Sequence, residues 1–168
     1  GSYREYYILV DEGASCMNDI GLYYQINVVP MNLAYSVVSD TVPTQSNSNG
    51  TSAGVISIRN DGNVSWFNIG KFPVRLGTSS PPDRVSQFRD SSWVGSTRIA
   101  NQNQFWVKPG ETATFNVSLK SPDVGGTYNE SLALVADGIT WSSQTFAHQM
   151  LVRQDFDAAF QNTSTSVV

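Results

Sequence analysis

The carboxylates that could perform acid–base chemistry are spread along the chain and form no recognisable pair. Those in question are Glu5, Asp83, Asp90, Glu130, Asp137, Asp155 and Asp157. Hydrolysis of a glycosidic bond needs two carboxyl groups that face one substrate, and no spacing here predicts such a dyad. Most of these residues are expected in turns or on the surface. For Glu130 we expect either a solvent-facing position on a strand or an ion pair with an arginine.

The single histidine, His148, and the single cysteine, Cys16, offer little further chemistry. One thiol cannot form an intramolecular disulfide, and these two residues cannot supply the usual zinc ligand set. We expect Cys16 to be a small buried apolar residue and His148 to be a packing position rather than a general base. Neither a Gly-x-Ser-x-Gly elbow nor a phosphate-binding loop is present. The sequence therefore predicts no enzyme activity and no cofactor or metal ion.

One polar, turn-rich stretch, residues 78–104, concentrates side chains that could hold a ligand. Together with an indole just beyond the stretch, they could bind a sugar by ring stacking and hydrogen bonds. The candidate ligand-binding residues are Asp83, Arg84, Arg89, Asp90, Trp93 and Trp106. The preferred alternative is that the Asp/Arg pairs fasten this insertion to the domain, with Trp93 as its anchor. Calcium binding by the same aspartates lacks the dense Asp/Asn loop that such sites use.

The elements that must position these residues are short β-strands, because apolar and polar side chains alternate over most of the chain. The clearest case is residues 112–120, where every second side chain is apolar. Similar patterns occupy residues 31–39, 55–60, 63–69, 72–77, 128–135 and 145–152. No stretch has helical periodicity over ten residues. We expect an all-β, immunoglobulin-like sandwich of about seven to eight strands with a long polar insertion loop.

Composition narrows the classes of partner. Charged residues make up 14% of the chain and the net charge is −4, with no Lys/Arg cluster. A nucleic-acid partner is therefore not expected, because phosphate binding needs a basic surface. No apolar run approaches the roughly 18 residues that cross a bilayer, so no transmembrane segment is expected. A surface built of Ser, Thr, Asn and Gln is typical of secreted β-proteins and predicts an extracellular or cell-surface location.

An internal repeat organises the chain. Residues 3–16 align with residues 128–141 without a gap, and after a one-residue gap the match continues to Val152. The identical pairs include Tyr3 with Tyr128, Glu5 with Glu130, Gly13 with Gly138, Gln25 with Gln149 and Val28 with Val152. Two segments related at a period of about 125 residues indicate two copies of one structural unit.

The repeat predicts the domain organisation. Residues 1–29 are expected to be the C-terminal β-hairpin of a preceding repeat, residues 30–153 a complete domain, and residues 154–168 a tail or linker. A lone two-stranded hairpin is marginally stable at best. The expected partners are therefore neighbouring repeats or identical subunits, with pairing in cis and in trans both open.

Two segments, "IRNDGNVSW" and "KPGETATFNVSLKSPDVGGTYNESLALVADGITW", resemble the signature of the four-tryptophan family of Ig-like domains. The segment "PVRLGTSSPPDRVSQFRDSSWVGSTRIA" looks closer still to bacterial cell-surface Ig-like tandem repeats. The matching positions are Asn60, Gly62, Trp66, Pro109, Gly110, Tyr128 and Trp141. The resemblance implies an Ig-like fold that acts as a binding or spacer unit. We expect Trp66 and Trp141 to be core residues between the sheets.

The sequence leaves two functions open. The first is a non-catalytic Ig-like module of a secreted or cell-surface tandem-repeat protein. Such a module would act in surface assembly, as part of a stalk, filament or surface layer, or in adhesion through packing of domain on domain. The alternative is a glycan-binding or cell-wall-binding module that targets an attached enzyme.

Overall fold

The computed structural model describes residues 1–154, so Asp155, Asp157 and nearly all of the expected tail lie outside the described residues. Within the described part the chain is all-β and contains no helix, which confirms the predicted class. None of the described segments is a helix that could cross a membrane. The chain divides into two compact units, Gly1–Met31 and Asn32–Val168.

The first unit is a long β-hairpin. Its two arms are β1 (Ser2–Tyr7) and β4 (Leu22–Asn27), which pair in antiparallel fashion. Its tip is the short pair β2 (Val10–Asp11) and β3 (Ser15–Cys16). Every residue from 1 to 31 is exposed. The expectation that Cys16 is buried is therefore wrong, because no second layer covers either face of the hairpin tip.

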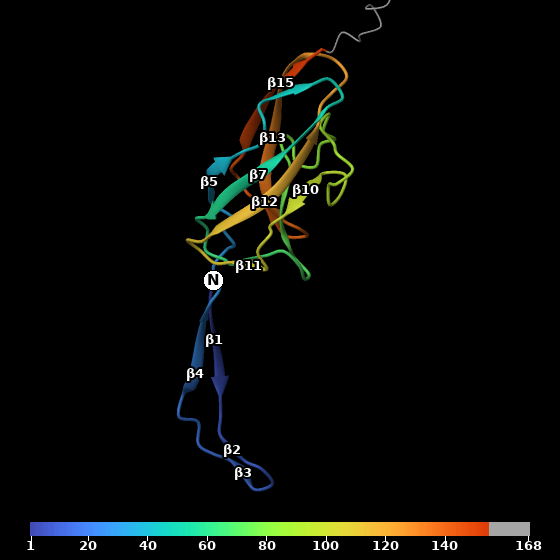
Figure 1. The fold of residues 1–168 in the computed structure, drawn as a ribbon. Helices are drawn as coiled ribbons and strands as arrows, with labels where there is room; N and C mark the ends of the chain where they lie inside the picture. The colour runs from blue at the N-terminus through green and yellow to red at the C-terminus, as the bar shows by residue number, and fades with distance from the viewer. Residues whose placement is uncertain (155–168) are drawn as a thin grey trace, which may run out of the picture. The chain divides into compact units, whose positions relative to one another are not determined.

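The second unit contains two packed sheets, and the smaller sheet has three strands in the order β12-β7-β5 (Figure 1). These strands are β5 (Tyr35–Asp40), β7 (Thr51–Asn60) and β12 (Thr112–Lys120), and both pairings are antiparallel. The apolar positions of β12 are all at most 2% exposed: Ala113, Phe115, Val117 and Leu119. The alternation in the sequence therefore identified both the strand and its inward face.

The larger sheet has the strand order β10-β9-β13-β15-β6, and β14 pairs with the end of β13. Its strands are β6 (Gln45–Asn47), β9 (Val74–Thr78), β10 (Arg98–Asn101), β13 (Gly126–Ala136), β14 (Thr140–Trp141) and β15 (Phe146–Arg153). Only the pairing of β6 with β15 is parallel among those of this sheet. Because β5 belongs to one sheet and β6 to the other, residues 41–44 carry the chain across the edge of the sandwich.

The core lies between the two sheets and draws large side chains from both. Its fully buried members include Ile56, Ile58, Trp66, Leu76, Phe115, Leu132, Leu134 and Met150. Trp66 starts β8 (Trp66–Phe67), which pairs with β11 (Trp106–Val107) at one end of the sandwich. The core therefore combines one aromatic anchor with aliphatic side chains from each layer, as close packing of two sheets requires.

Trp141 is only half-buried, so the expectation of a place between the sheets is wrong for this residue. It lies on the short strand β14, and the Arg98 guanidinium stacks 4.9 Å from its ring centroid. A β-carbon built on Gly77 would lie 2.8 Å from the Trp141 ring. The indole therefore packs against the backbone of β9 at Gly77.

The expected insertion loop, residues 78–104, is more ordered than the sequence suggests. Strand β10 occupies its last part, so the segment is not a loop throughout. Phe88 and Trp93, both from this segment, are buried members of the core cluster. The segment is therefore a flap held by its own aromatic side chains.

The motif residues around Asn60 hold a tight corner of the sandwich. Asn60 is fully buried; its Nδ2 donates to the carbonyls of Val64 (2.8 Å) and Val107 (3.1 Å). Its Oδ1 accepts from the amide of Gly62 (3.0 Å). The neighbouring turn has Gly110 at φ 87°, in the left-handed region that the third position of a type II turn requires. The Glu111 amide donates to the Lys108 carbonyl at 3.0 Å and closes this turn.

Candidate functional site

Asp83 pairs with an arginine far from it in sequence rather than with its neighbour Arg84. It forms an ion pair with Arg98, and the Thr97 hydroxyl donates to the same carboxylate oxygen at 2.9 Å. The hydrogen bond from Arg98 is the main reason that the pKa of Asp83 lies below its usual value. Arg98 also donates to Asp137 (2.7 Å), which accepts from Arg75 on its other oxygen (2.6 Å). The acid therefore belongs to a network that ties the insertion to β9 and the end of β13.

Arg84 reaches a different carboxylate. Its Nη2 donates to Glu130 Oε1 at 2.7 Å, and the Ser86 hydroxyl donates to Oε2 at 2.8 Å. Glu130 is 1% exposed, and this burial raises its pKa, while the bonds from Ser86 and Arg84 oppose the rise. The predicted arginine partner is confirmed, and the alternative of a solvent-facing Glu130 is wrong. Buried carboxylates persist where they are paired in this way.

The last two charged candidates lie apart from both networks. Asp90 accepts bonds from the amide and the hydroxyl of Ser92, and this hydroxyl is the main cause of its lowered pKa. Arg89 is exposed. The four charged candidates therefore do not converge on one ligand position. Two of them fasten the insertion to the sandwich, as the preferred alternative to ligand binding predicted.

The two candidate tryptophans have separate environments. Trp93 is 8% exposed, and its Nε1 donates to the carbonyl of Ser118 at 2.6 Å. It anchors the flap, and its ring is not open for stacking. Trp106 is 50% exposed, and the ammonium of Lys108 lies 4.6 Å from its ring centroid.

Trp106 is part of an exposed aromatic patch formed by Phe67, Phe105 and Trp106. The ring centroids of Phe67 and Trp106 are 6.3 Å apart, and those of Phe67 and Phe105 are 6.2 Å apart. Phe67 and Trp106 are direct cross-strand partners in the β8–β11 pair. Neither phenylalanine was among the residues predicted from the sequence. The sequence feature that could have predicted them is the pair of aromatic dipeptides at 66–67 and 105–106. These dipeptides indicate an aromatic cluster only when the two strands are known to pair.

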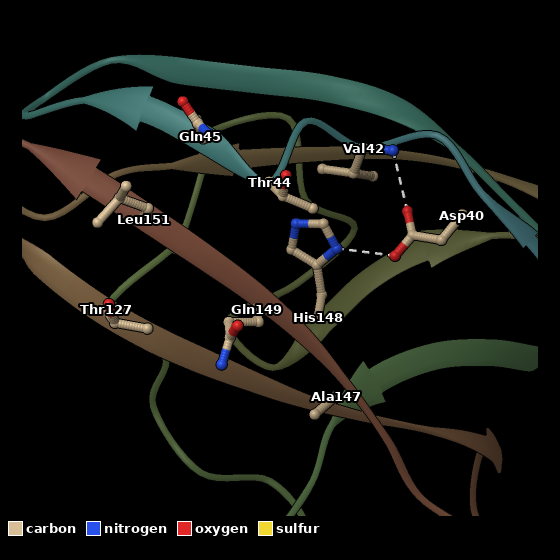
Figure 2. Close-up of a pocket in the computed structure, with 9 residues that line it drawn as sticks. All are labelled: Asp40, Val42, Thr44, Gln45, Thr127, Ala147, His148, Gln149 and Leu151. Atoms are coloured by element: carbon tan, nitrogen blue, oxygen red, sulfur yellow. Dashed lines mark hydrogen bonds and ion pairs between the residues drawn. The ribbon is translucent and has the colours of Figure 1, made fainter.

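A pocket of about 580 Å³ lies where β6 meets β15 (Figure 2). It is lined by Asp40, Val42, Thr44, Gln45, Thr127, Ala147, His148, Gln149 and Leu151. Figure 2 shows the imidazole of His148 pointing from β15 toward the crossover segment. Its Nδ1 lies 2.7 Å from Asp40 Oδ2, and its Nε2 lies 3.2 Å from the carbonyl oxygen of Pro43.

This arrangement leaves no ring nitrogen of His148 free to act on a substrate. Both nitrogens face oxygen acceptors, and the side chain is almost fully buried. The second oxygen of Asp40 accepts from the Val42 amide at 2.9 Å, so the acid is also committed. The pair fastens the crossover to β15, in agreement with the predicted packing position. No group of three or more His, Cys, Asp or Glu side chains within residues 1–154 is placed to hold a metal ion.

The remaining candidate site is one face of the N-terminal hairpin, called the hairpin face. Its members are Tyr3, Glu5, Tyr7, Leu9, Leu22, Tyr24, Ile26 and Val28. The arms of this hairpin pair in the same register as β13 and β15. Tyr3 is opposite Ile26 as Tyr128 is opposite Met150, and Tyr7 is opposite Leu22 as Leu132 is opposite Phe146.

The tips of the two hairpins agree as well. Val10 pairs with Cys16 in the first hairpin as Val135 pairs with Trp141 in the second. Gly13 and Gly138 both have positive φ, 88° and 76°. The amide of Met17 donates to the Leu9 carbonyl, and that of Ser142 to the Leu134 carbonyl, both at 2.9 Å. The two segments that align in sequence therefore have the same backbone pairing from arm to tip.

The two hairpins differ in what covers them. In the second hairpin the equivalents of the hairpin face are packed into the core, and Leu132, Leu134 and Met150 are fully buried. The large apolar members of the hairpin face are 47–70% exposed. An exposed apolar surface of this kind is typical of interaction sites.

These observations define an all-β protein of packed sheets that carries a second, uncovered copy of its own terminal hairpin. No known protein family matches the chain, and no curated protein is detectably similar to it.

Proposed function

We propose that the chain is a non-catalytic, Ig-like module of a secreted or cell-surface tandem-repeat protein. It acts in surface assembly or adhesion through packing of domain on domain. The observation that carries this proposal is the hairpin Gly1–Met31, which reproduces the register and turn of β13–β15 without the sandwich that covers β13–β15. A protein that repeats a structural unit along its chain supplies such pieces naturally.

The strand order supports the Ig-like assignment. A three-stranded sheet β12-β7-β5 packs on the sheet β10-β9-β13-β15-β6, and the first strands of the unit divide between the two layers. Two packed sheets of this size, antiparallel except for one edge pair and with a buried tryptophan in the core, resemble the architecture of Ig-like domains. The resemblance of the Asn60 corner and the Pro109-Gly110 turn to the four-tryptophan family points to the same fold.

The side chains favour a module without catalysis. The buried histidine uses both ring nitrogens to hold the crossover, and the buried glutamate is paired with Arg84. Both groups therefore stabilise the fold instead of facing a substrate. A surface of hydroxyls and amides with 14% charged residues suits an extracellular module.

Surface labelling of the organism that makes the protein tests this function. An antibody against residues 32–153 should label intact cells or their shed filaments, and the protein should be extracted in assemblies larger than one chain. An antibody against a cytosolic enzyme, which labels only broken cells, is the control. Labelling confined to broken cells would contradict the proposal.

Glycan or wall binding is the second candidate, and the exposed aromatic patch favours it. Stacked aromatic rings are suited to the apolar faces of sugars. Trp106→Ala should weaken binding to purified wall polysaccharide at least tenfold with little change in melting temperature. Val85→Ala, at an exposed apolar residue outside the patch, should leave binding unchanged. Equal binding by the Trp106 variant and the parent chain would remove this candidate.

A further inference from the structure

A carboxylate lies in the middle of the otherwise apolar hairpin face. Glu5 occupies the position that Glu130 holds in the second hairpin: Glu5 is opposite Tyr24 as Glu130 is opposite His148. In the second hairpin this carboxylate is covered, and two donors from the insertion, Arg84 and Ser86, reach it. A carboxylate covered by protein without such donors costs several kcal/mol.

Several other members of the hairpin face match apolar positions that lie in the core or pack against it. Leu9 stands where Leu134 stands, Ile26 where Met150 stands, and Tyr3 where Tyr128 stands. The turn at the hairpin tip is also the same, with a left-handed glycine in both copies. The hairpin face therefore has the register, the turn, the apolar pattern and the carboxylate of one half of an interface. The other half of such an interface is the surface of residues 32–125 that β13 and β15 cover in this chain.

We infer that the hairpin face is covered by a second sandwich body, related to residues 32–125, which precedes the hairpin in the same polypeptide and directs an arginine at Glu5. The order follows from the repeat, because β13 and β15 are the last strands of their unit and the body comes before them. This inference rests on the tandem arrangement in the proposed function and names the partner within it. The hairpin then completes the core of that body as β13 and β15 complete theirs.

A second copy of this same chain does not fit as the occupant. The corresponding place on residues 32–125 is already filled by β13 and β15 of the same molecule. The hairpin also carries Tyr7 and Tyr24 where the second hairpin has buried Leu132 and His148. Larger side chains at fully packed positions are destabilising. The covering body therefore has more room opposite both tyrosines.

The hairpin tip specifies a further difference in the covering body. Trp141 packs so closely on Gly77 that a β-carbon there would lie 2.8 Å from the indole. The equivalent of Trp141 in the first hairpin is the small Cys16. The body that receives Cys16 has space for a side chain at its counterpart of Gly77.

The experiment extends the full chain with an added body. Residues 32–125 are fused in front of Gly1, so that the junction reproduces the natural step from Gly125 to Gly126. Amide hydrogen exchange of residues 1–29 is then compared in the parent chain and the fusion. We expect exchange in the arms to slow at least a hundredfold in the fusion once Tyr7 and Tyr24, which crowd this body, are replaced, with residues 32–153 unchanged.

Three variants of the fusion test the arginine contact and the fit. Arg84→Met in the added body alone should reduce the protection about a hundredfold, the scale for an unpaired buried charge, and adding Glu5→Gln should restore much of it. Tyr7→Leu with Tyr24→His in the first hairpin relieves crowding by this particular body. Slower exchange in the fusion, with or without these two substitutions, supports the inference. If both fusions exchange as fast as the parent chain, the inference is wrong.

Light scattering of the parent chain tests whether a second copy of the chain covers the hairpin face instead. A monomer at all concentrations is expected, whereas a dimer with protected residues 1–29 would assign the face to a second copy and overturn the inference. The outcome does not depend on location. If the hairpin is protected in the fusion but the protein is found only inside cells, the proposed function is wrong and the inference about the covering body still holds. If the protein is found on the cell surface but the hairpin stays unprotected in the fusion, the proposed function holds and the inference is wrong.

Discussion

The Arg84 guanidinium donates to the Glu130 carboxylate across 2.7 Å, which joins the irregular insertion to a central strand of the larger sheet. Ser86 adds a second donor from the same segment. The pair is therefore internal to the fold, and the insertion cannot move away from β13 without leaving a buried carboxylate unpaired.

Glu130→Gln should change the pH dependence of stability. Burial raises the pKa of Glu130 in the folded state above its value in the unfolded chain. A raised carboxyl pKa contributes stability that is present at low pH and is lost as the pH rises through the folded value. The free energy of unfolding of the parent chain minus that of the variant should therefore fall as the pH rises above the ordinary pKa of a glutamate. Urea unfolding followed by tryptophan fluorescence measures it.

The control for this prediction is Asp123→Asn, at an exposed carboxylate in the turn before β13. Its difference from the parent chain should show no comparable fall over the same pH range. A parent-minus-variant difference that rises with pH at Glu130 would mean that the ion pair outweighs burial, contrary to the raised pKa of this carboxyl.

Trp93 and Trp106 should differ sharply in their effect on stability. Trp93→Ala removes a buried indole and its bond to Ser118, so it should cost about 3–5 kcal/mol. Trp106→Ala removes a half-exposed side chain and should cost about 1 kcal/mol or less. Urea unfolding of both variants provides the comparison. Similar losses at the two positions would contradict the assignment of Trp93 as the anchor of the flap.

Asn60→Ala should destabilise the sandwich by about 2–4 kcal/mol, because two buried carbonyls and one amide lose their partner. The loss should appear as a lower midpoint in urea at an unchanged slope. Asn129→Ala, at an exposed position on β13, serves as the matched control and should shift the midpoint little. An Asn60 variant as stable as this control would show that the corner does not depend on the amide.

Cys16 should react with a thiol reagent in the native protein about as fast as in urea. Its side chain is exposed at the hairpin tip, and thiol reactivity follows access as well as ionisation. The rate of disulfide exchange with a chromogenic aromatic disulfide measures this. A thiol that reacts only after denaturation would show that the tip is covered in the chain as it stands.

The strands and turns followed from local rules. Alternation in residues 112–120 identified β12 and its buried face, because side chains of a strand point to opposite sides in turn. The left-handed glycine of the Pro109-Gly110 turn followed from the preference of that turn for glycine. The repeat alignment anticipated the shared register of the two hairpins. The turn of a hairpin fixes which residues of its two strands lie opposite each other, and the two turns align in sequence.

The side-chain partners did not follow from local rules. Arg84 was grouped with its neighbours in sequence, but it lies against Glu130, 46 positions away. Trp141 was expected between the sheets, yet it is only half-buried, and the absence of a side chain at Gly77 lets it pack against the backbone of β9 instead. Burial of Cys16 was inferred from residue type, which carries no information on whether a second layer is present. Such contacts are set by how distant strands meet.

The parallel pairing of β6 with β15 has a mechanical consequence. The first of these strands lies near the start of the unit and the second ends it, and both run in the same direction. Tension applied at Asn32 and Arg153 pulls them in opposite directions along their common axis. The hydrogen bonds between them, with the His148–Asp40 clamp at one end, are then sheared at the same moment. Stretching the unit requires these bonds to rupture together, whereas strands peeled from one end would release them singly.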